Sequence, residues 1–241
     1  DPRLDFALDT KTLINSLNKR TKLIFICSPN NPTGRSIAAS EIETVCKAAS
    51  GRALVILDEA YLEFSNKQSL QSLQKRYQHV VCLRTLSKFV SLAGVRCGAL
   101  IAIPKLIEFL GNVLPPYTFP TPSIELVLKA LSTDSLKISM ERNALLCTER
   151  TRLASALERI PAVKKVWPSD ANFLLIETQN REEFSETAQR AGILVRTFGE
   201  QKPLDQCVRV TVGLPKDNDL LLKAFSKSDH DNLSIRRREI L

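Results

Sequence analysis

Short apolar runs alternate with helix-like stretches over the first half of the chain. Strands that alternate with helices are typical of βαβ units, in which neighbouring strands run parallel. The apolar runs have the length of buried strands, and the stretches between them have the mixed pattern of helices. This half therefore predicts an α/β fold with a mostly parallel sheet, with strands at 23–27, 53–57 and 80–83 and helices at 39–49 and 104–112.

A proline-rich segment then interrupts the pattern. Four prolines within 114–122 forbid a continuous helix or a central strand, so we expect a boundary there. From Ser123 to about Ile160 apolar residues recur among charged ones, as in one long connecting helix. A small α/β domain is expected to follow, with strands at 163–166, 173–176, 193–195 and 207–212 and helices at 182–191 and 216–225.

These patterns divide the 241 residues into three parts. Residues 1–121 hold the parallel sheet, and residues 122–226 hold the connecting helix and the small domain. Residues 227–241 form a polar tail that mixes three consecutive arginines with acidic residues. Because such tails bury little apolar surface, we expect this one to be disordered.

The formal net charge of +8 fits either a nucleic-acid-binding protein or a site for anionic ligands. The basic residues are dispersed, without interleaved aromatic residues, so we expect anionic ligands and no nucleic acid.

No apolar stretch approaches the roughly 20 residues that span a bilayer, and the first residues lack the features of a signal peptide. The six cysteines form no C-x-x-C pair and there are two histidines, which argues against a disulfide framework or a metal site. We expect a cytoplasmic protein with reduced thiols and no membrane contact.

Polar residues follow each of the three predicted parallel strands. They are Ser-Pro-Asn-Asn-Pro-Thr-Gly at 28–34, Asp-Glu-Ala-Tyr at 58–61 and Arg-Thr-Leu-Ser-Lys at 84–88. Ligands bind at the carboxyl ends of strands in an open parallel sheet. An isolated lysine is usually a solvated surface residue. Lys88, however, is flanked by hydroxyl groups and followed eight residues later by Arg96, an arrangement that suits a lysine bound to a phosphorylated aldehyde.

Six segments in this order resemble the fold type I aminotransferases that use pyridoxal phosphate, and among them the histidinol-phosphate aminotransferases. They are PNNPTG at 29–34, DEAYLEF at 58–64, RTLSK with LAGVRCG at 84–98, SDANFLL at 169–175, GILVR at 192–196 and VRVTVG at 208–213. The resemblance maps onto the middle and end of the family. It implies a three-layer α/β fold in which residues 1–121 are the carboxyl-terminal part of the large cofactor-binding domain, with an incomplete, mostly parallel sheet, followed by a small C-terminal α/β domain.

The resemblance implies pyridoxal 5'-phosphate as the cofactor and Lys88 as the residue that binds its aldehyde and carries the transferred proton. This role is expected to need a lysine buried beside other cations, so that its neutral form is accessible. Asp58 is implied to pair with the pyridine nitrogen, although an isolated Asp there would suit a strand-end cap. Tyr61 and Asn31 are implied to donate hydrogen bonds to the phenolic oxygen, and Asn31 also suits a plain turn.

The phosphate of the cofactor is implied to bind Thr85, Ser87 and Arg96, because hydroxyl groups and a planar guanidinium match a phosphate dianion. Ser87 alone would suit a helix cap. Ser91 stands where the family often has glycine, and its side chain is expected to narrow the loop.

Two further arginines are candidates for the substrate. Arg209 matches the family's arginine for the α-carboxylate, and its alternative is a buried ion pair with an acid of the protein. Arg196 is a weaker candidate for the substrate's phosphate, and Asn31 is also implied to contact the substrate. The implied reaction exchanges an amino group between L-histidinol phosphate and 2-oxoglutarate, or imidazole-acetol phosphate and glutamate in reverse, in histidine biosynthesis, by a homodimer in the full-length form.

Other functions stay open at this point. They are an aromatic or broad-specificity aminotransferase, an enzyme like threonine-phosphate decarboxylase, and a non-catalytic remnant. The first part of the family pattern cannot be located in this chain, so we expect the chain to have weak activity or none by itself.

Overall fold

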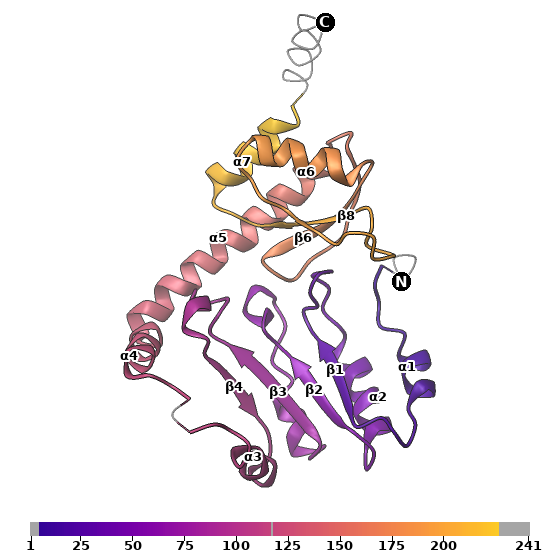
Figure 1. Ribbon diagram of the computed structural model, residues 1–241, viewed down its shortest axis with the longest axis vertical. Helices are drawn as coiled ribbons and strands as arrows, with labels where there is room; N and C mark the ends of the chain where they lie inside the picture. The colour runs from indigo at the N-terminus through magenta and orange to yellow at the C-terminus, as the bar shows by residue number, and fades with distance from the viewer. Residues whose placement is uncertain (1–4, 117, 227–241) are drawn as a thin grey trace, which may run out of the picture. The chain divides into compact units, whose positions relative to one another are not determined.

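The computed structural model describes residues 5–116 and 118–226, and the predicted polar tail lies outside these residues. The described chain divides into two compact units (Figure 1). The first consists of residues 6–31, 35–116 and 118–143, and the second of residues 5, 32–34 and 144–226. The division falls inside one long helix. The domain boundary expected at residue 121 coincides with the start of a helix, and it remains a prediction.

The first unit is built around a four-stranded sheet with the order β1-β2-β3-β4. The first three strands run parallel, and β4 is antiparallel to β3. Its strands are β1 (Leu23–Cys27), β2 (Leu54–Asp58), β3 (Val80–Thr85) and β4 (Gly98–Ile101). Its helices are α1 (Thr10–Ser16), α2 (Ala39–Ala49), α3 (Pro104–Gly111), α4 (Thr121–Ala130), the first part of α5 (Thr133–Leu157), and the short 3₁₀ helices η2 (Leu62–Phe64), η3 (Gln71–Lys75) and η4 (Ala93–Val95).

Alternate residues of the three parallel strands point into the core of this unit. Ile24, Val55 and Val80 are paired across the strands and buried, and they pack in one cluster with residues of α2. The intervening residues of β1 lie on the opposite face, where Phe25 is 64% exposed. The alternation follows from the two-residue period of a strand. The predicted α/β class and mostly parallel sheet are confirmed.

Strand β4 and helix α1 were not expected from the sequence. The four residues of β4 are short for a strand and begin with Gly98, a residue that disfavours strands. Glycine is needed here because a Cβ at this position would lie 2.9 Å from the carbonyl oxygen of Arg84 on β3. The amino-acid sequence of this segment is therefore typical of a loop. Its backbone pairing with β3 is what makes it a strand.

The single connecting helix expected from Ser123 to Ile160 is wrong, because the structure has two helices there. The break lies at Leu131 and Ser132. The hydroxyl of Ser132 accepts a hydrogen bond from the backbone N–H of Ser135 at 3.4 Å, in the manner of a helix N-cap. A serine that bonds the following amides begins a new helix and does not continue the old one.

The second unit holds a sheet with the order β5-β6-β8-β7, in which all neighbours are antiparallel. Its central strands β6 and β8 are labelled in Figure 1. One face of this sheet packs against helices through a core that includes Leu153, Phe184 and Leu221. The strands are β5 (Val163–Val166), β6 (Phe173–Thr178), β7 (Arg196–Thr197) and β8 (Cys207–Thr211), and the helices are the end of α5, α6 (Arg181–Arg190) and α7 (Pro215–Ala224).

The strand expected at 193–195 is also wrong, since the paired residues are Arg196 and Thr197. The backbone N–H of Ile193 donates to the carbonyl of Ala188 at 3.0 Å and thus caps α6. Gly192, with φ of +80°, makes the turn that this cap requires. The apolar residues 193–195 therefore follow the cap of α6, and the strand begins only at Arg196.

The described residues contain neither a membrane-spanning helix nor a cluster of metal-binding side chains. Between residues 5 and 226, Tyr117 excepted, no helix has both the length and the apolar character needed to cross a bilayer. The same residues contain no group of three or more His, Cys, Asp or Glu side chains that could hold a metal ion.

Candidate active site

The candidate site is built at the carboxyl ends of β2 and β3, where parallel strands deliver their last side chains to one edge. Asp58 ends β2, and its Oδ1 accepts a hydrogen bond from the backbone N–H of Ala60 at 3.0 Å. Its Oδ2 lies 3.9 Å from Sγ of Cys27, the paired residue on β1. Burial, followed by the negative charge of Asp58, raises the pKa of the Cys27 thiol. The thiol therefore stays protonated at neutral pH and donates to the carboxylate.

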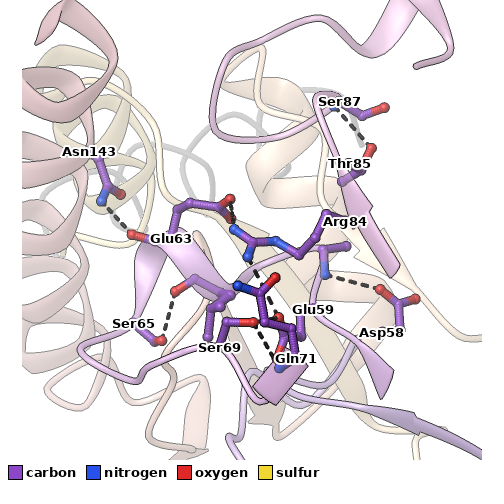
Figure 2. A network of polar contacts seen from close by, with 12 residues as sticks. Asp58, Glu59, Glu63, Ser65, Ser69, Gln71, Arg84, Thr85, Ser87 and Asn143 are labelled. Atoms are coloured by element: carbon purple, nitrogen blue, oxygen red, sulfur yellow. Dashed lines mark hydrogen bonds and ion pairs between the residues drawn. The ribbon is translucent and has the colours of Figure 1, made fainter. Parts of the chain in front are cut away.

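The residues around Lys88 form a turn that packs against the start of β4. The backbone N–H of Ser87 donates to Oγ1 of Thr85 at 3.1 Å (Figure 2), and Oγ1 of Thr85 lies 3.5 Å from the carbonyl oxygen of Cys97. The N–H of Leu86 also donates to that carbonyl, at 3.1 Å. These contacts fix both hydroxyl-bearing residues next to the lysine.

Lys88 is exposed in this chain, so the expectation that it is buried beside other cations is wrong for the described residues. Its Nζ lies 5.4 Å from the centroid of the Tyr61 ring, within the range of a cation–π contact. Tyr61 itself is buried at the start of η2. The structure thus brings together two predicted site residues that are 27 positions apart.

Arg96 adopts a left-handed backbone conformation, with φ of 58° and ψ of 40°. Its side chain is exposed, and Nη1 donates to the carbonyl of Ala93 at 3.0 Å. Ser91, in the same loop, also has a positive φ of 59°. A positive φ is the conformation that glycine adopts most easily, which gives a backbone reason for the glycine expected at position 91.

A cavity of about 530 Å³ joins these residues. It is lined by five of the predicted site residues, Asp58, Thr85, Ser87, Lys88 and Arg96, together with Arg84 and several residues of β4. The lining residues include the cationic Lys88 and Arg96 and the carboxylate Asp58, while the guanidinium of Arg84 is paired with Glu59 and Glu63. The cavity therefore offers an amine, a carboxylate, hydroxyl groups and a guanidinium group to one ligand, a set that suits an anion with a reactive carbonyl.

Asn31 and Tyr61 are not among the residues that line this cavity. Asn31 is exposed in the turn that follows β1. The turn is closed by a hydrogen bond from the N–H of Asn30 to the carbonyl of Arg35 at 2.8 Å, and the N–H of Ile37 donates to Oγ of Ser28 at 3.0 Å. The plain-turn interpretation of this segment thus holds, and it does not compete with a binding role.

The two substrate candidates lie in the second unit, directly opposite each other. Arg196 on β7 pairs with Arg209 on β8 across an antiparallel ladder. The guanidinium carbon of Arg209 is 5.0 Å from the centroid of the Phe173 ring. Directly opposite residues share a face, and two like charges there repel each other. An anion between them would relieve that repulsion.

Sequence reasoning missed Arg84 and its partners Glu59 and Glu63. Arg84 lines the cavity and forms ion pairs with both carboxylates. A signal was present, because a charged residue near the end of the apolar strand 80–83 needs a partner, and acidic residues follow the neighbouring strand. Their pairing depends on strand register, which the sequence does not display.

Comparison with known proteins identifies the family of this chain. A family model for class I and II aminotransferases matches residues 1–225. A histidinol-phosphate aminotransferase of Xylella fastidiosa is 40% identical over 223 residues, which cover 92% of this chain and 61% of the relative. The chain thus spans about three fifths of that relative's length.

Solved structures share the fold. The histidinol-phosphate aminotransferase of Clostridium acetobutylicum matches with a TM-score of 0.83 at 24% identity, over 94% of this chain and 69% of that one. The histidinol-phosphate aminotransferase of Sinorhizobium meliloti in complex with pyridoxal-5'-phosphate matches with a TM-score of 0.78 at 22% identity, over 91% of this chain and 60% of that one. The resemblance expected from the six sequence segments is confirmed, and the chain belongs to the class I and II aminotransferase family.

Proposed function

We propose that this chain carries the lysine-bearing site of a pyridoxal-phosphate-dependent aminotransferase. The observation that carries the proposal is that Lys88, Asp58, Thr85, Ser87 and Arg96 line one and the same cavity. Each chemical group that a phosphorylated pyridine aldehyde needs is present there: an amine, a carboxylate, hydroxyl groups and a permanent cation. The donor set therefore fits the cofactor.

In this proposal each residue has one task. Lys88 binds the aldehyde carbon, Asp58 holds the ring nitrogen, and Thr85, Ser87 and Arg96 bind the phosphate. When bound, the cofactor supplies an electron sink for the negative charge left when an amino acid loses its α-proton. Lys88 then holds and moves that proton at Nζ, because it is the basic group on the cavity wall.

Tyr61 and Asn31 are proposed to donate hydrogen bonds to the phenolic oxygen of the cofactor. The contact between the Tyr61 ring and Nζ of Lys88 supports the first assignment. The exposed position of Asn31 in its turn leaves its side chain accessible to a ligand, which is compatible with the second and with a contact to the substrate.

The substrate is proposed to be L-histidinol phosphate, with 2-oxoglutarate as the amino acceptor, in histidine biosynthesis. Such a pair needs a site for a carboxylate and a site for a phosphate. The opposed arginines support this choice: Arg209 is proposed to bind the carboxylate, and Arg196 the phosphate. The names of the relatives favour the same substrate.

Association with a second copy is also proposed, as the resemblance implies for the full-length form. Large apolar side chains are exposed along 107–131 in the first unit, among them Phe109 at 67%, Val113 at 72% and Leu128 at 67%. Exposed apolar surface of this kind favours association. The exposed Phe25 on β1 is a further apolar side chain that favours association.

The test is an amino-transfer assay with the 241-residue chain at a concentration close to that of its substrates, so that one transfer per chain is detectable. The chain is supplied with pyridoxal phosphate, histidinol phosphate and 2-oxoglutarate, and glutamate and carbon dioxide are both measured. We expect glutamate without carbon dioxide, and neither product with Lys88→Ala. Carbon dioxide as the main product would favour a decarboxylase, and glutamate formation that survives Lys88→Ala would contradict the proposal.

A further inference from the structure

Arg84, near the end of β3, lies between two carboxylates (Figure 2). Its Nη1 is 3.6 Å from Oε2 of Glu59, and its Nη2 is 2.5 Å from Oε1 of Glu63. Glu59 is 3% exposed and also accepts hydrogen bonds from Oγ of Ser69 at 2.6 Å and from the N–H of Leu70 at 2.7 Å. The network therefore joins the ends of β2 and β3 to η2 and to the loop before η3.

Arg84 is part of the cavity wall, and its side chain extends from there to the two carboxylates of this network. Asp58 and Thr85 also line the cavity, and each is the immediate chain neighbour of a member of the ion pair, Glu59 and Arg84 respectively. Each end of the ion pair thus holds the backbone that carries one cavity group.

Tyr61 is flanked by the same network. It lies two residues after Glu59 and two residues before Glu63, and both carboxylates contact the one guanidinium of Arg84. The backbone carbonyl of Glu63 also accepts a hydrogen bond from Nδ2 of Asn143 at 2.6 Å. The segment that carries Tyr61 is therefore held on both sides, by Arg84 and by Asn143.

The burial of Glu59 makes the arrangement stiff. A buried carboxylate such as Glu59 is stable only if its charge is compensated and its oxygens accept hydrogen bonds. Ser69, Leu70 and Arg84 meet that need, and any rotation of Arg84 would leave Glu59 without its cation. A site performs well only if its groups are held within about half an ångström of their working positions.

We propose that Arg84, Glu59 and Glu63 are positioning residues that hold Asp58, Tyr61 and Thr85 in the geometry required for cofactor binding. The inference rests on the proposed function, and it adds residues to which no role in that function was assigned. The three residues act through the backbone of their neighbours.

The first test needs no cofactor. The chain has three tyrosines, so labelling with 3-fluorotyrosine gives three ¹⁹F resonances, which Tyr→Phe substitutions assign. We expect Arg84→Ala and the milder Glu63→Gln to shift the resonance of Tyr61. Arg76→Ala is the matched control, because it removes an ion pair with Glu43 in the same unit. That control should move Tyr77, whose hydroxyl donates to Glu43 at 2.9 Å, and leave Tyr61 unchanged.

The second test is the dissociation constant of pyridoxal phosphate, measured by visible absorption below the unfolding temperature of each variant. We expect Arg84→Ala to raise it about tenfold or more, Glu63→Gln to raise it less, and Arg76→Ala to leave it within about twofold of the wild-type value. Arg84→Lys keeps the charge and should recover part of the loss. If Arg84→Ala does not fold, Glu63→Gln alone decides, because it leaves the Arg84–Glu59 pair intact.

The outcomes are distinguishable. Folded variants that keep both the Tyr61 resonance and the dissociation constant of the wild type overturn the inference, and so does an equal effect of Arg76→Ala on Tyr61. If the wild-type chain does not bind the cofactor at Lys88, the proposed function fails and the fluorine signal alone decides. In that case, a Tyr61 resonance that shifts in the Arg84 and Glu63 variants supports the positioning role of these residues. An unshifted resonance overturns it.

Discussion

Replacing Gly34 with alanine should destabilise the second unit, because the position leaves no room for a side chain. A Cβ there would lie 2.2 Å from Oγ, 2.6 Å from Cβ and 3.1 Å from Cα of Ser169. Rotation of Ser169 cannot relieve the contact with its Cβ. Its Oγ also donates to the carbonyl of Phe173 at 2.6 Å and accepts from the N–H of Ala171 at 3.0 Å. The backbone of this loop must therefore shift.

Two costs add up in Gly34→Ala. Gly34 has a φ of +74°, and an alanine in the left-handed region costs about 1–2 kcal/mol. Overpacking that forces backbone movement costs about 1–3 kcal/mol more. Gly192, in the same unit, has a φ of +80° and nothing within 4 Å of an added Cβ. Gly192→Ala should therefore carry only the first cost.

Urea unfolding would measure both variants through the fluorescence of Trp167, the single tryptophan, which is buried in the second unit. We expect Gly34→Ala to lose about 1–3 kcal/mol more than Gly192→Ala. Adding Ser169→Ala should recover only part of this loss, since it removes the contact to Oγ and leaves the contact to Cβ. Equal free energies of unfolding for the two glycine variants would refute the reasoning.

Three further predictions follow from other positions. Ser91→Gly should raise stability by about 1 kcal/mol in thermal unfolding, because Ser91 has a φ of 59°, and a lower melting temperature would contradict this. Burial raises the pKa of Cys46 to about 11 and of Cys82 and Cys207 to about 12. The folded state therefore favours the protonated thiols, and their contribution is complete below the unfolded pKa of 9.0 and is lost as pH rises towards 11 to 12. The free energy of unfolding measured in urea should fall between pH 8 and pH 10, by about 1 kcal/mol for each thiol, and a constant value would argue against this. Arg196→Ala should raise the KM for histidinol phosphate far more than that for an unphosphorylated amine, since a lost charge-assisted contact costs about 1.5–3 kcal/mol, and equal effects would remove Arg196 from the site.

The sequence predicted the elements whose pattern is local. The three parallel strands and helix α2 fall where their hydrophobic periodicity indicated. The break at Ser132, strand β4 and the cap at Ile193 were missed. Each depends on a hydrogen bond whose partner cannot be read from apolar periodicity, such as the one that the N–H of Ile193 makes to Ala188.

The candidate site likewise has features that the sequence predicts and features that it does not. The polar residues at the strand ends gather around one cavity because parallel strands end at one edge, a rule that needs no coordinates. The exposure of Lys88 and the ion pairs of Arg84 could not be predicted. They depend on how completely the surrounding chain covers the edge and on which side chains the strand register places together.

The most direct measurement is to locate the bond between the chain and its cofactor. The 241-residue chain is incubated with pyridoxal phosphate and reduced with borohydride, and the labelled peptide is identified by mass spectrometry. The proposed function predicts a label on Lys88. Inorganic phosphate should reduce the amount of this label, because it would compete with the phosphate group of the cofactor for Arg96, Thr85 and Ser87. A label spread over other lysines, or a label on Lys88 that phosphate does not affect, would contradict the assignment of this cavity as the cofactor site.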